Sequence, residues 1–405
     1  MNNKKIIKRL KLFTIICVIV LIIELVFIGY SLLFKNKESL YFDGINAIET
    51  NNNYYVTVGS NNDNINNYEK AKISQYNMKK EKVFEKLYNV GYNSAFFGVC
   101  LDEDNIVVVG SYEKTKEEHE NLIRRAIIVK YDSEGKIVFE KDFKLLDNSK
   151  FTSIVKVDDG YIVTGQSVYQ ITHVGNMPGG ALLAKYSKDG ELLWNRTYGS
   201  NNSASFNDLV VNNGYIYTVG VDNDYLGIIC KYDLNGKFIS YNDYKYTDEL
   251  GFSGIEIIND NIYISGSNRG SKNYINAMIV KYDLDCTYLD EVIHEDKGIT
   301  RYNKLIKDSH DNIIGIGIMT TNKTTNRKKL KTAETINYDG IIGKYNKNLK
   351  EISTVTYGDE RDDYFNDIKM VDNDYLVVGY SSYEDGSYLS KFIRYSDALK
   401  LLGVD

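Results

Sequence analysis

Residues 206–237, FNDLVVNNGYIYTVGVDNDYLGIICKYDLNGK, decide the fold of this chain. The stretch opens on Phe206, runs through an apolar segment to a polar Asn-Asn-Gly turn, and continues into a second apolar segment that ends at Gly220. A third segment ends at Lys231-Tyr232 and runs into a second tight turn. Short runs rich in β-branched and aromatic residues, separated by Gly and Asn turns, are typical of antiparallel strands.

Versions of this unit recur through residues 41–405 of the 405-residue chain. Each opens with an aromatic residue, two variable residues and an aliphatic residue, and the opening residues are Phe42, Phe96, Phe151, Phe206, Phe252, Tyr302 and Phe365. Each second strand ends on a glycine, namely Gly59, Gly110, Gly165, Gly220, Gly266, Gly317 or Gly379. Each third strand ends on a tyrosine, namely Tyr76, Tyr131, Tyr186, Tyr232, Tyr282, Tyr345 or Tyr395. Three independent markers therefore indicate seven units, which start near residues 42, 96, 151, 206, 252, 302 and 365.

A fourth strand follows most of these tyrosines, most clearly at residues 191–199. Four strands in each of seven units predict an all-β fold, a seven-bladed β-propeller of four-stranded antiparallel blades. The glycine at the end of each second strand is expected to let neighbouring backbones approach closely. The last unit contains its own third and fourth strands, and residues 39–41 could add a short closing strand.

The repeat resembles the bacterial β-propeller repeat families, most of which are surface or exported proteins. The resemblance is carried by D-G-Y-I-V-T-G at residues 159–165, K-Y-S-K-D-G at residues 185–190 and the L-W…Y-G pattern at residues 192–199. It covers residues 41–405 and implies the propeller fold without any assigned chemistry. The pattern departs from its tryptophan everywhere except at Trp194, so the blade edges are expected to pack differently elsewhere.

The N-terminal segment predicts a membrane anchor. Residues 1–11 are basic, and residues 12–34 are 23 mostly apolar residues, enough to span a hydrocarbon core of about 30 Å. Positive charge stays cytoplasmic, which predicts a single-pass protein of the cell membrane with its propeller, residues 41–405, on the extracytoplasmic side. The apolar run exceeds the core of a cleavable signal, which favours an uncleaved signal anchor over cleavage. Residues 35–40 form a short linker that reaches at most about 20 Å.

Two charged features of the sequence suggest membrane-related contacts. Glu24 lies in the middle of the apolar run and either contacts a polar group on a partner membrane helix or is carried in protonated form by the surrounding Leu and Ile. The other feature is a basic cluster in the sixth unit, made of Arg327, Lys328, Lys329 and Lys331. It is either an anionic-surface site for lipid headgroups or a wall polymer, or a solvated insertion.

Loop length predicts where a ligand would bind. The long loops, residues 111–125, 167–180 and 318–340, all join second and third strands, so they should share one face. The third position of each opening motif (Gly44, Gly98, Ser153, Asp208, Gly254, Lys304 and Asp367) should fall near the channel mouth. We therefore expect Asp208, Lys304 and Asp367 to form a ligand-binding opening, with a merely polar channel wall as the alternative.

Composition narrows the function. A net charge of −6 argues against a nucleic-acid binder. The four Cys and four His have no metal-ligand spacing, and we expect no cofactor, metal or catalytic residue. These features favour a membrane-anchored extracytoplasmic binding or scaffold module whose partner is a protein, a glycan or an anionic polymer. The alternatives are a propeller enzyme acting on cell-surface polysaccharide and an accessory subunit of a membrane complex.

Overall fold

The computed structural model describes residues 43–51, 53–63, 68–115, 122–144, 148–167, 170–172, 175–177, 180–199, 204–222, 226–244, 251–270, 274–296, 298–321, 337–359, 361–383 and 387–404. The chain divides into two units, Met1–Leu40 and Tyr41–Asp405, and every described residue belongs to the second. The segments predicted at residues 1–11, 12–34 and 35–40 therefore lie outside the described residues. Within the described part of the chain, no helix has the length and apolar character needed to cross a membrane.

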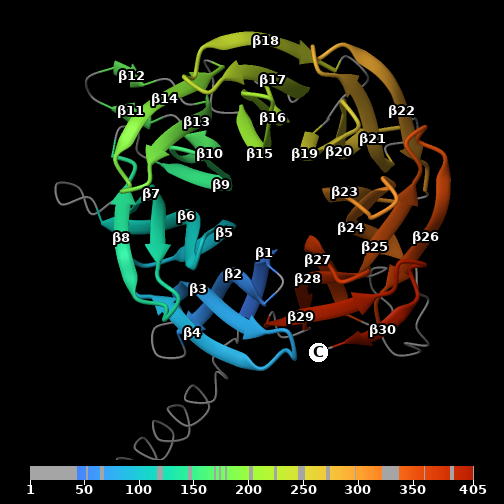
Figure 1. Cartoon of the computed structure of the whole chain (residues 1–405), viewed down its shortest axis with the longest axis horizontal. Helices are drawn as coiled ribbons and strands as arrows, with labels where there is room; N and C mark the ends of the chain where they lie inside the picture. Colours follow the sequence, from blue (N-terminus) through green and yellow to red (C-terminus); the bar gives the residue numbers. More distant parts are fainter. Residues whose placement is uncertain are drawn as a thin grey trace, which may run out of the picture. The chain divides into compact units, whose positions relative to one another are not determined.

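Seven antiparallel sheets of four strands each surround a central axis, which confirms the seven-bladed β-propeller (Figure 1). We number these blades 1 to 7 along the chain. Their strands are β1 (Asp43–Thr50), β2 (Tyr54–Asp63), β3 (Tyr68–Asn77) and β4 (Lys82–Tyr88) in blade 1; β5 (Ser94–Asp102), β6 (Asn105–Thr115), β7 (Leu122–Tyr131) and β8 (Ile137–Asp142) in blade 2; β9 (Ser149–Val157), β10 (Gly160–Ser167), β13 (Gly180–Ser187) and β14 (Leu192–Tyr198) in blade 3; β15 (Ser205–Asn212), β16 (Tyr215–Val221), β17 (Gly227–Asp233) and β18 (Phe238–Asp243) in blade 4; β19 (Gly251–Ile258), β20 (Asn261–Arg269), β21 (Ile275–Asp283) and β22 (Tyr288–His294) in blade 5; β23 (Thr300–Lys307), β24 (Ile313–Thr321), β25 (Asn337–Tyr345) and β26 (Glu351–Tyr357) in blade 6; and β27 (Asp362–Val371), β28 (Asp374–Ser382), β29 (Tyr388–Tyr395) and β30 (Leu401–Val404) in blade 7.

Each blade runs outward from the axis, with its first strand innermost and its fourth strand at the rim (Figure 1). All seven blades have the fourth strand that the sequence indicated for most of them. In the described residues, β1 and β30 belong to different sheets, so neither strand joins the blade of the other, and the closing strand suggested at residues 39–41 lies outside the described residues. The seam between blades 7 and 1 is instead bridged by side chains, because Asn366 Nδ2 donates to the Ile45 carbonyl at 2.8 Å.

A β-bulge in each inner strand explains the repeated glycine. In blade 4, Phe206 pairs with Gly220 and the next pair is Asp208 with Val219, so Asn207 is the extra residue of the bulge. A Cβ atom on Gly220 would lie 1.8 Å from the carbonyl oxygen of Ser205. Only glycine therefore fits, and the close approach that we predicted occurs within one blade.

The same register corrects the predicted start of blade 1. Ile45 pairs with Gly59 and Ala47 pairs with Val58, as Phe206 and Asp208 do in blade 4. The opening residue of blade 1 is therefore Ile45, and the third position is Ala47 instead of Gly44. The prediction was wrong because it followed the aromatic residue Phe42, which lies outside the described residues.

Hydrophobic burial takes place between blades. Val107 and Val109 of blade 2 share one cluster with Phe151, Tyr161 and Val163 of blade 3, and all five are fully buried. A lone four-stranded sheet would leave these side chains in water, so each blade needs its neighbours.

The single tryptophan has equivalents that the sequence pattern did not reveal. Trp194 of blade 3 lies under the turn glycine Gly236 of blade 4, so close that a Cβ there would be 2.9 Å from the ring. Phe139 occupies the same place beneath Gly190, where an added Cβ atom would lie 2.7 Å from the phenyl ring. The expectation that blade edges without tryptophan pack differently was therefore wrong for blade 2, because phenylalanine fills the same position.

The two faces of the ring differ. The turns between third and fourth strands are closed by their own side chains: Asp233 Oδ1 accepts from the backbone N–H groups of Asn235 and Lys237 at 2.9 and 2.8 Å. The connections between second and third strands are more elaborate. The β6–β7 ladder extends to the pair Thr115 and Leu122, and an extra hairpin, β11 (Gln170–Thr172) with β12 (Gly175–Met177), replaces the plain loop expected in blade 3.

Candidate functional site

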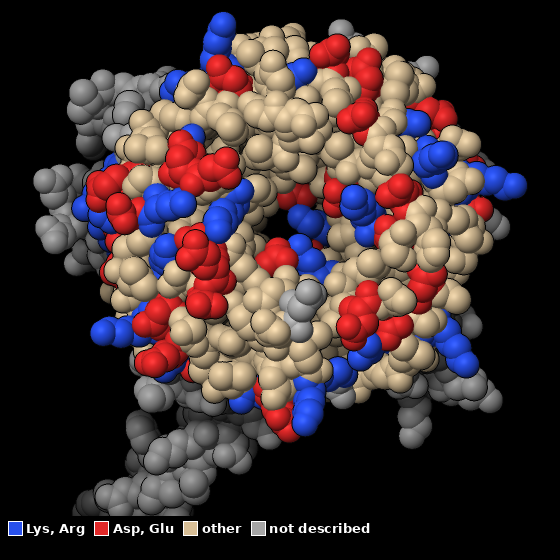
Figure 2. Space-filling model, in the orientation of Figure 1, with Lys and Arg blue, Asp and Glu red and all other residues tan. Residues whose placement is uncertain are grey.

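The inner strands enclose a cavity of about 300 Å³ on the axis of the ring. It is lined by the middle parts of the inner strands, and its charged lining residues are Glu49, Asp208, Glu256, Lys304, Asp367 and Lys369. Figure 2 shows an opening at the centre of the ring with acidic and basic side chains around it. Asp208, Lys304 and Asp367 therefore line one cavity, as their positions in the repeat predicted.

The extra residue of each bulge ties one inner strand to the next. In five of the described blades its side chain donates to the carbonyl of the opening residue in the following blade. These bonds are Asn46 to Phe96 (2.9 Å), Thr152 to Phe206 (2.8 Å), Asn207 to Phe252 (2.7 Å), Asn303 to Phe365 (3.0 Å) and Asn366 to Ile45 (2.8 Å). The polar side chains at the bulges around the cavity thus mostly hydrogen-bond neighbouring blades to one another.

Asp208 is the most heavily bonded acid of the wall. Its Oδ2 lies 2.7 Å from Lys304 Nζ in blade 6, its Oδ1 accepts from Ser153 Oγ in blade 3 at 2.8 Å, and Ile255 N of blade 5 donates to it at 3.3 Å. One carboxylate therefore links four blades. Burial alone would lower the pKa of Lys304, but Asp208 and Asp367 outweigh it and raise this pKa above its ordinary value.

Two other acids of the wall, Asp367 and Glu256, have carboxyl groups whose charged form is disfavoured by burial. Asp367 accepts backbone hydrogen bonds from Ile48 at 2.9 Å and Ile368 at 2.8 Å. Burial raises the pKa of Asp367 more than Lys304 lowers it. Burial also raises the pKa of Glu256. The cavity thus combines two close ion pairs, Asp208–Lys304 and Lys369–Glu49 (2.9 Å), with two further carboxyl groups.

The bonded state of these residues limits their chemistry. Thr152 Oγ1 donates to a backbone carbonyl, which is no base, whereas Ser153 Oγ donates to the Asp208 carboxylate, whose other oxygen is paired with Lys304. The described wall of the cavity is suited to holding the ring together or to binding a small polar ligand.

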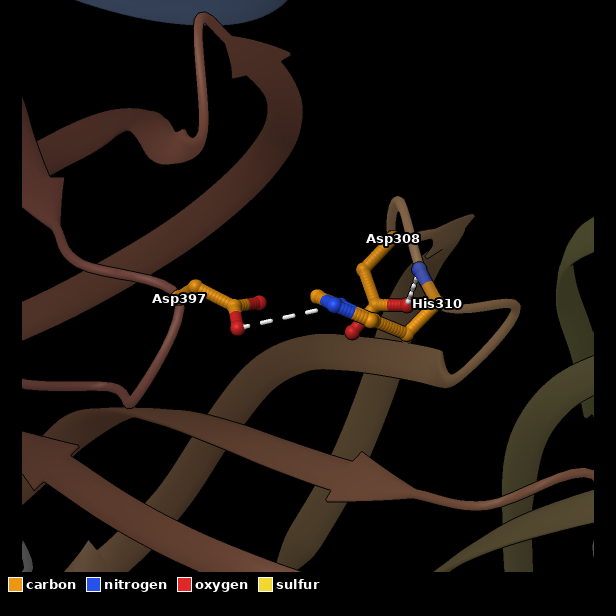
Figure 3. A group of neighbouring side chains, drawn as sticks. All are labelled: Asp308, His310 and Asp397. Carbon is orange, nitrogen blue, oxygen red and sulfur yellow. Dashed lines mark hydrogen bonds and ion pairs between the residues drawn. The ribbon is translucent and has the colours of Figure 1, made fainter.

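A second cluster, Asp308, His310 and Asp397, has the residue types of a cation site (Figure 3). The figure shows His310 pointing across the seam between blades 6 and 7 towards Asp397, with 3.9 Å between Nδ1 and Oδ2. However, Lys344 Nζ lies 2.9 Å from Asp308 Oδ2 and 2.8 Å from Asp397 Oδ1. The hydrogen bond from Lys344 lowers the pKa of Asp397. The ammonium group therefore already supplies the cation that this cluster would attract.

Lys344 represents a structural device that the sequence analysis missed. In several blades the lysine before the third-strand tyrosine reaches a carbonyl in the third-to-fourth turn of the next blade. The bonds are Lys185 to Leu234 (3.4 Å), Lys231 to Leu284 (2.7 Å), Lys281 to Lys347 (3.3 Å) and Lys344 to Asp397 (2.9 Å). The repeated Lys-Tyr pair was the available signal, since an apolar strand has no other reason to contain a lysine at a fixed position.

Several predicted site residues lie outside the described residues, namely Glu24 and the basic cluster of Arg327, Lys328, Lys329 and Lys331. Of the cysteines, Cys100, Cys230 and Cys286 are free and buried. Burial raises the pKa of Cys286 to about 11, which keeps its thiol protonated and unreactive.

No protein-family model matches this chain, and no curated protein matches it. Solved structures do. A lectin, BP39L from Burkholderia pseudomallei, is 9% identical with a TM-score of 0.55, over 90% of this chain and 99% of the lectin. Sqt1 from Chaetomium thermophilum is 11% identical with a TM-score of 0.52, over 90% of this chain and 87% of Sqt1.

A puromycin-hydrolyzing peptidase from Mycobacterium tuberculosis is 8% identical with a TM-score of 0.51, over 89% of this chain. This chain spans only about half of the peptidase, 52% of its length. At such low identity, these likenesses support the propeller fold and carry no activity with them.

Proposed function

We propose that this protein is a binding or scaffold module that acts through the face carrying its second-to-third-strand connections. The observation that carries the proposal is the difference between the two faces. One face consists of short turns closed by their own side chains, whereas the other carries the extended β6–β7 ladder and the inserted β11–β12 hairpin. Elaborated loops on a rigid scaffold are where proteins usually bind their partners.

We further propose that residues 12–34 anchor the module in the cell membrane and leave residues 41–405 outside. The apolar length and the preceding basic residues support this arrangement. Lys188 is exposed in a turn of blade 3 and offers a test. In Lys188→Cys, a membrane-impermeant maleimide should label the protein on intact cells, and labelling only after lysis would place the propeller inside.

Glu24 and the basic cluster extend this proposal to partners. Glu24→Leu should abolish co-purification of a membrane partner if a polar contact recruits one, and unchanged co-purification would remove that role. Neutralising Arg327, Lys328, Lys329 and Lys331 together should reduce salt-sensitive binding to anionic vesicles. An unaltered salt profile would leave the cluster as a solvated insertion.

The central test is a binding footprint. The purified full chain in detergent is mixed with soluble oligosaccharides, wall polymers, and vesicles of anionic or neutral lipid, and binding is followed by biolayer interferometry. Hydrogen exchange of each binding mixture then locates the contact. The proposal expects protection in the β6–β7 and β10–β13 connections. Protection confined to the third-to-fourth turns would overturn it.

The enzyme alternative is tested with the same mixtures. Chromatography of the probes after incubation would detect cleavage, and Asp208→Asn and Asp367→Asn would then show whether the cavity carboxyls are responsible. Cleavage that both variants abolish would replace the binding module with a polysaccharide-acting enzyme. Intact probes together with a loop-face footprint would support the module.

A further inference from the structure

Four half-buried tyrosines form a continuous run of ring contacts on blades 6 and 7. Tyr338 in β25 lies 5.7 Å from Tyr364 in β27, measured between ring centroids. Tyr364 stacks on Tyr380 in β28 at 4.8 Å with an interplanar angle of 23°, and Tyr380 meets the edge of Tyr388 in β29 at 5.1 Å. We call these four residues the tyrosine ladder. It lies towards the second-to-third-strand connections, since Tyr364 directly precedes and Tyr380 directly follows the bulge pair of blade 7.

The repeat itself shows that the fold does not require these rings. Tyr364 pairs with Tyr380 one step from the bulge, and the pairs at the same register in blades 1 to 6 are Gly44–Ser60, Ala95–Ser111, Lys150–Gln166, Ser205–Val221, Gly251–Ser267 and Arg301–Ile318. Blades 1 and 5 form the same strand pairing with only glycine and serine at this register. The pairing of the first two strands in blade 7 therefore does not require an aromatic pair at this register.

Acidic groups flank the ladder. Asp362 accepts from the backbone N–H of Tyr338 at 2.9 Å and from Ser382 Oγ at 3.4 Å. Burial, together with the neighbouring Tyr388, Asp362 and Glu69, raises the pKa of Tyr380 to about 12. Glu69 belongs to β3 of blade 1, and Gly44 of the same blade lies against the ring of Tyr380, where a Cβ atom would be 3.7 Å from Cδ1. The phenol of Tyr380 is neutral at physiological pH and can donate a hydrogen bond.

We propose that the tyrosine ladder is a carbohydrate-binding surface, on which aromatic rings meet the C–H faces of neutral sugar rings while Asp362 and Glu69 accept hydrogen bonds from sugar hydroxyls. This inference rests on the proposed binding function and names its ligand class. The rings hold one another in place, so a ligand that lies on them immobilises few additional side-chain torsions. Tyrosine also offers a large contact area with only two side-chain torsions.

The donor and acceptor balance separates a sugar from other ligands of aromatic surfaces. A proline-rich peptide presents carbonyl acceptors and lacks N–H groups at its prolines, so the carboxylates of Asp362 and Glu69 would have nothing to accept. An anionic polymer would be repelled by the same carboxylates. Sugar hydroxyls supply donors without charge, which fits both features.

The test uses the purified full chain with four probes: cellohexaose, chitohexaose, laminarihexaose and a proline decamer, each titrated by isothermal calorimetry. We expect saturable binding of at least one hexasaccharide. Tyr380→Ala should weaken that binding at least tenfold, whereas Tyr380→Phe, which keeps the ring, should change it by no more than about threefold. Tyr215→Ala serves as the matched control, because this half-exposed tyrosine begins β16 at the opposite face.

Thermal unfolding of each variant separates lost binding from lost structure. If Tyr380→Ala unfolds, Tyr388→Ala at the end of the ladder and Asp362→Asn take its place with the same expected loss. Failure of all three hexasaccharides to bind, or equal binding by wild type and the ladder variants, would overturn the inference. Ladder-dependent binding of the proline decamer would overturn the ligand class but keep the binding module. A footprint on the third-to-fourth turns would instead overturn the proposed function.

Discussion

The ion pair between Asp208 and Lys304 should stabilise the ring by coupling blades 4 and 6. The pair is close, at 2.7 Å, and the side chain of Asp208 is only 5% exposed while that of Lys304 is 27% exposed. Asp208→Ala removes a charge-assisted hydrogen bond, worth about 2 kcal/mol, and two weaker bonds from Ser153 and Ile255 that water in the cavity partly replaces. We expect a total loss of about 3 kcal/mol in the free energy of unfolding.

Lys304→Met should cost less, about 2 kcal/mol, because Asp208 keeps its other two donors. The double variant Asp208→Ala/Lys304→Met should also cost about 3 kcal/mol, since the second substitution removes a charge that the first has already left unpaired. The coupling energy of the cycle is then about 2 kcal/mol. Asp208 and Asp367 raise the pKa of Lys304 against the effect of burial, so this coupling is fully present from neutral pH to about pH 10 and is lost as the pH rises through the folded-state pKa of Lys304.

Urea unfolding followed by circular dichroism measures the four proteins of the cycle. The matched control is Lys141–Glu191, a pair of similar length (2.6 Å) whose side chains are 38% and 71% exposed. Exposed pairs contribute little, so its cycle should give about 0.5 kcal/mol or less. If the coupling energy of the Asp208–Lys304 cycle were no larger than that of this control, the cavity charges would not stabilise the ring. A ligand-binding role for these charges would then be favoured.

Three further outcomes follow from single positions. Burial raises the pKa of Glu256 in the folded protein, so Glu256 costs the fold no stability below its unfolded pKa of about 4.3 and destabilises the fold as the pH rises and the buried carboxyl ionises. Glu256→Gln should therefore raise the melting temperature at pH 7 and leave it equal to that of wild type at low pH. Glu103 is an exposed turn residue with a φ of 57°, so Glu103→Gly should stabilise the protein by about 1 kcal/mol in urea unfolding. Asn366→Ala removes a bridge between blades 7 and 1, so it should cost about 1 kcal/mol and speed hydrogen exchange first in β1 and β27, whereas uniform exchange would argue against a weakened seam.

The architecture could be predicted from the sequence because each blade repeats the same physical requirements. The bulge needs a glycine such as Gly220 opposite it, and the blade interface needs an aromatic residue such as Phe206 before it. Where one requirement was met differently the prediction failed. Blade 1 uses Ile45 in place of an aromatic residue, so Phe42 was taken for the opening position.

The partners of the cavity residues could not be predicted in the same way. Their place on the axis follows from the repeat, but Lys304 bonds Asp208 across the intervening blade 5, 96 residues away in sequence. Nothing local to either residue indicates that pairing. The repeated lysine before Tyr345 and its equivalents was visible, yet its acceptor is a backbone carbonyl in the next blade, which leaves no trace in residue type.

Departures from the repeat are the places where function can be sought in a fold of this kind. Asp208, Lys304 and Asp367 depart from the small residues at the same position in blades 1, 2, 3 and 5, and the fold accounts for Asp208 and Lys304 through their ion pair. The tyrosine ladder also differs from the repeat. Its aromatic rings contact one another on the face of the propeller that carries the elaborated connections. Because the rings lie at the face where the scaffold is elaborated, we propose the tyrosine ladder ahead of the central cavity as the place where a ligand binds.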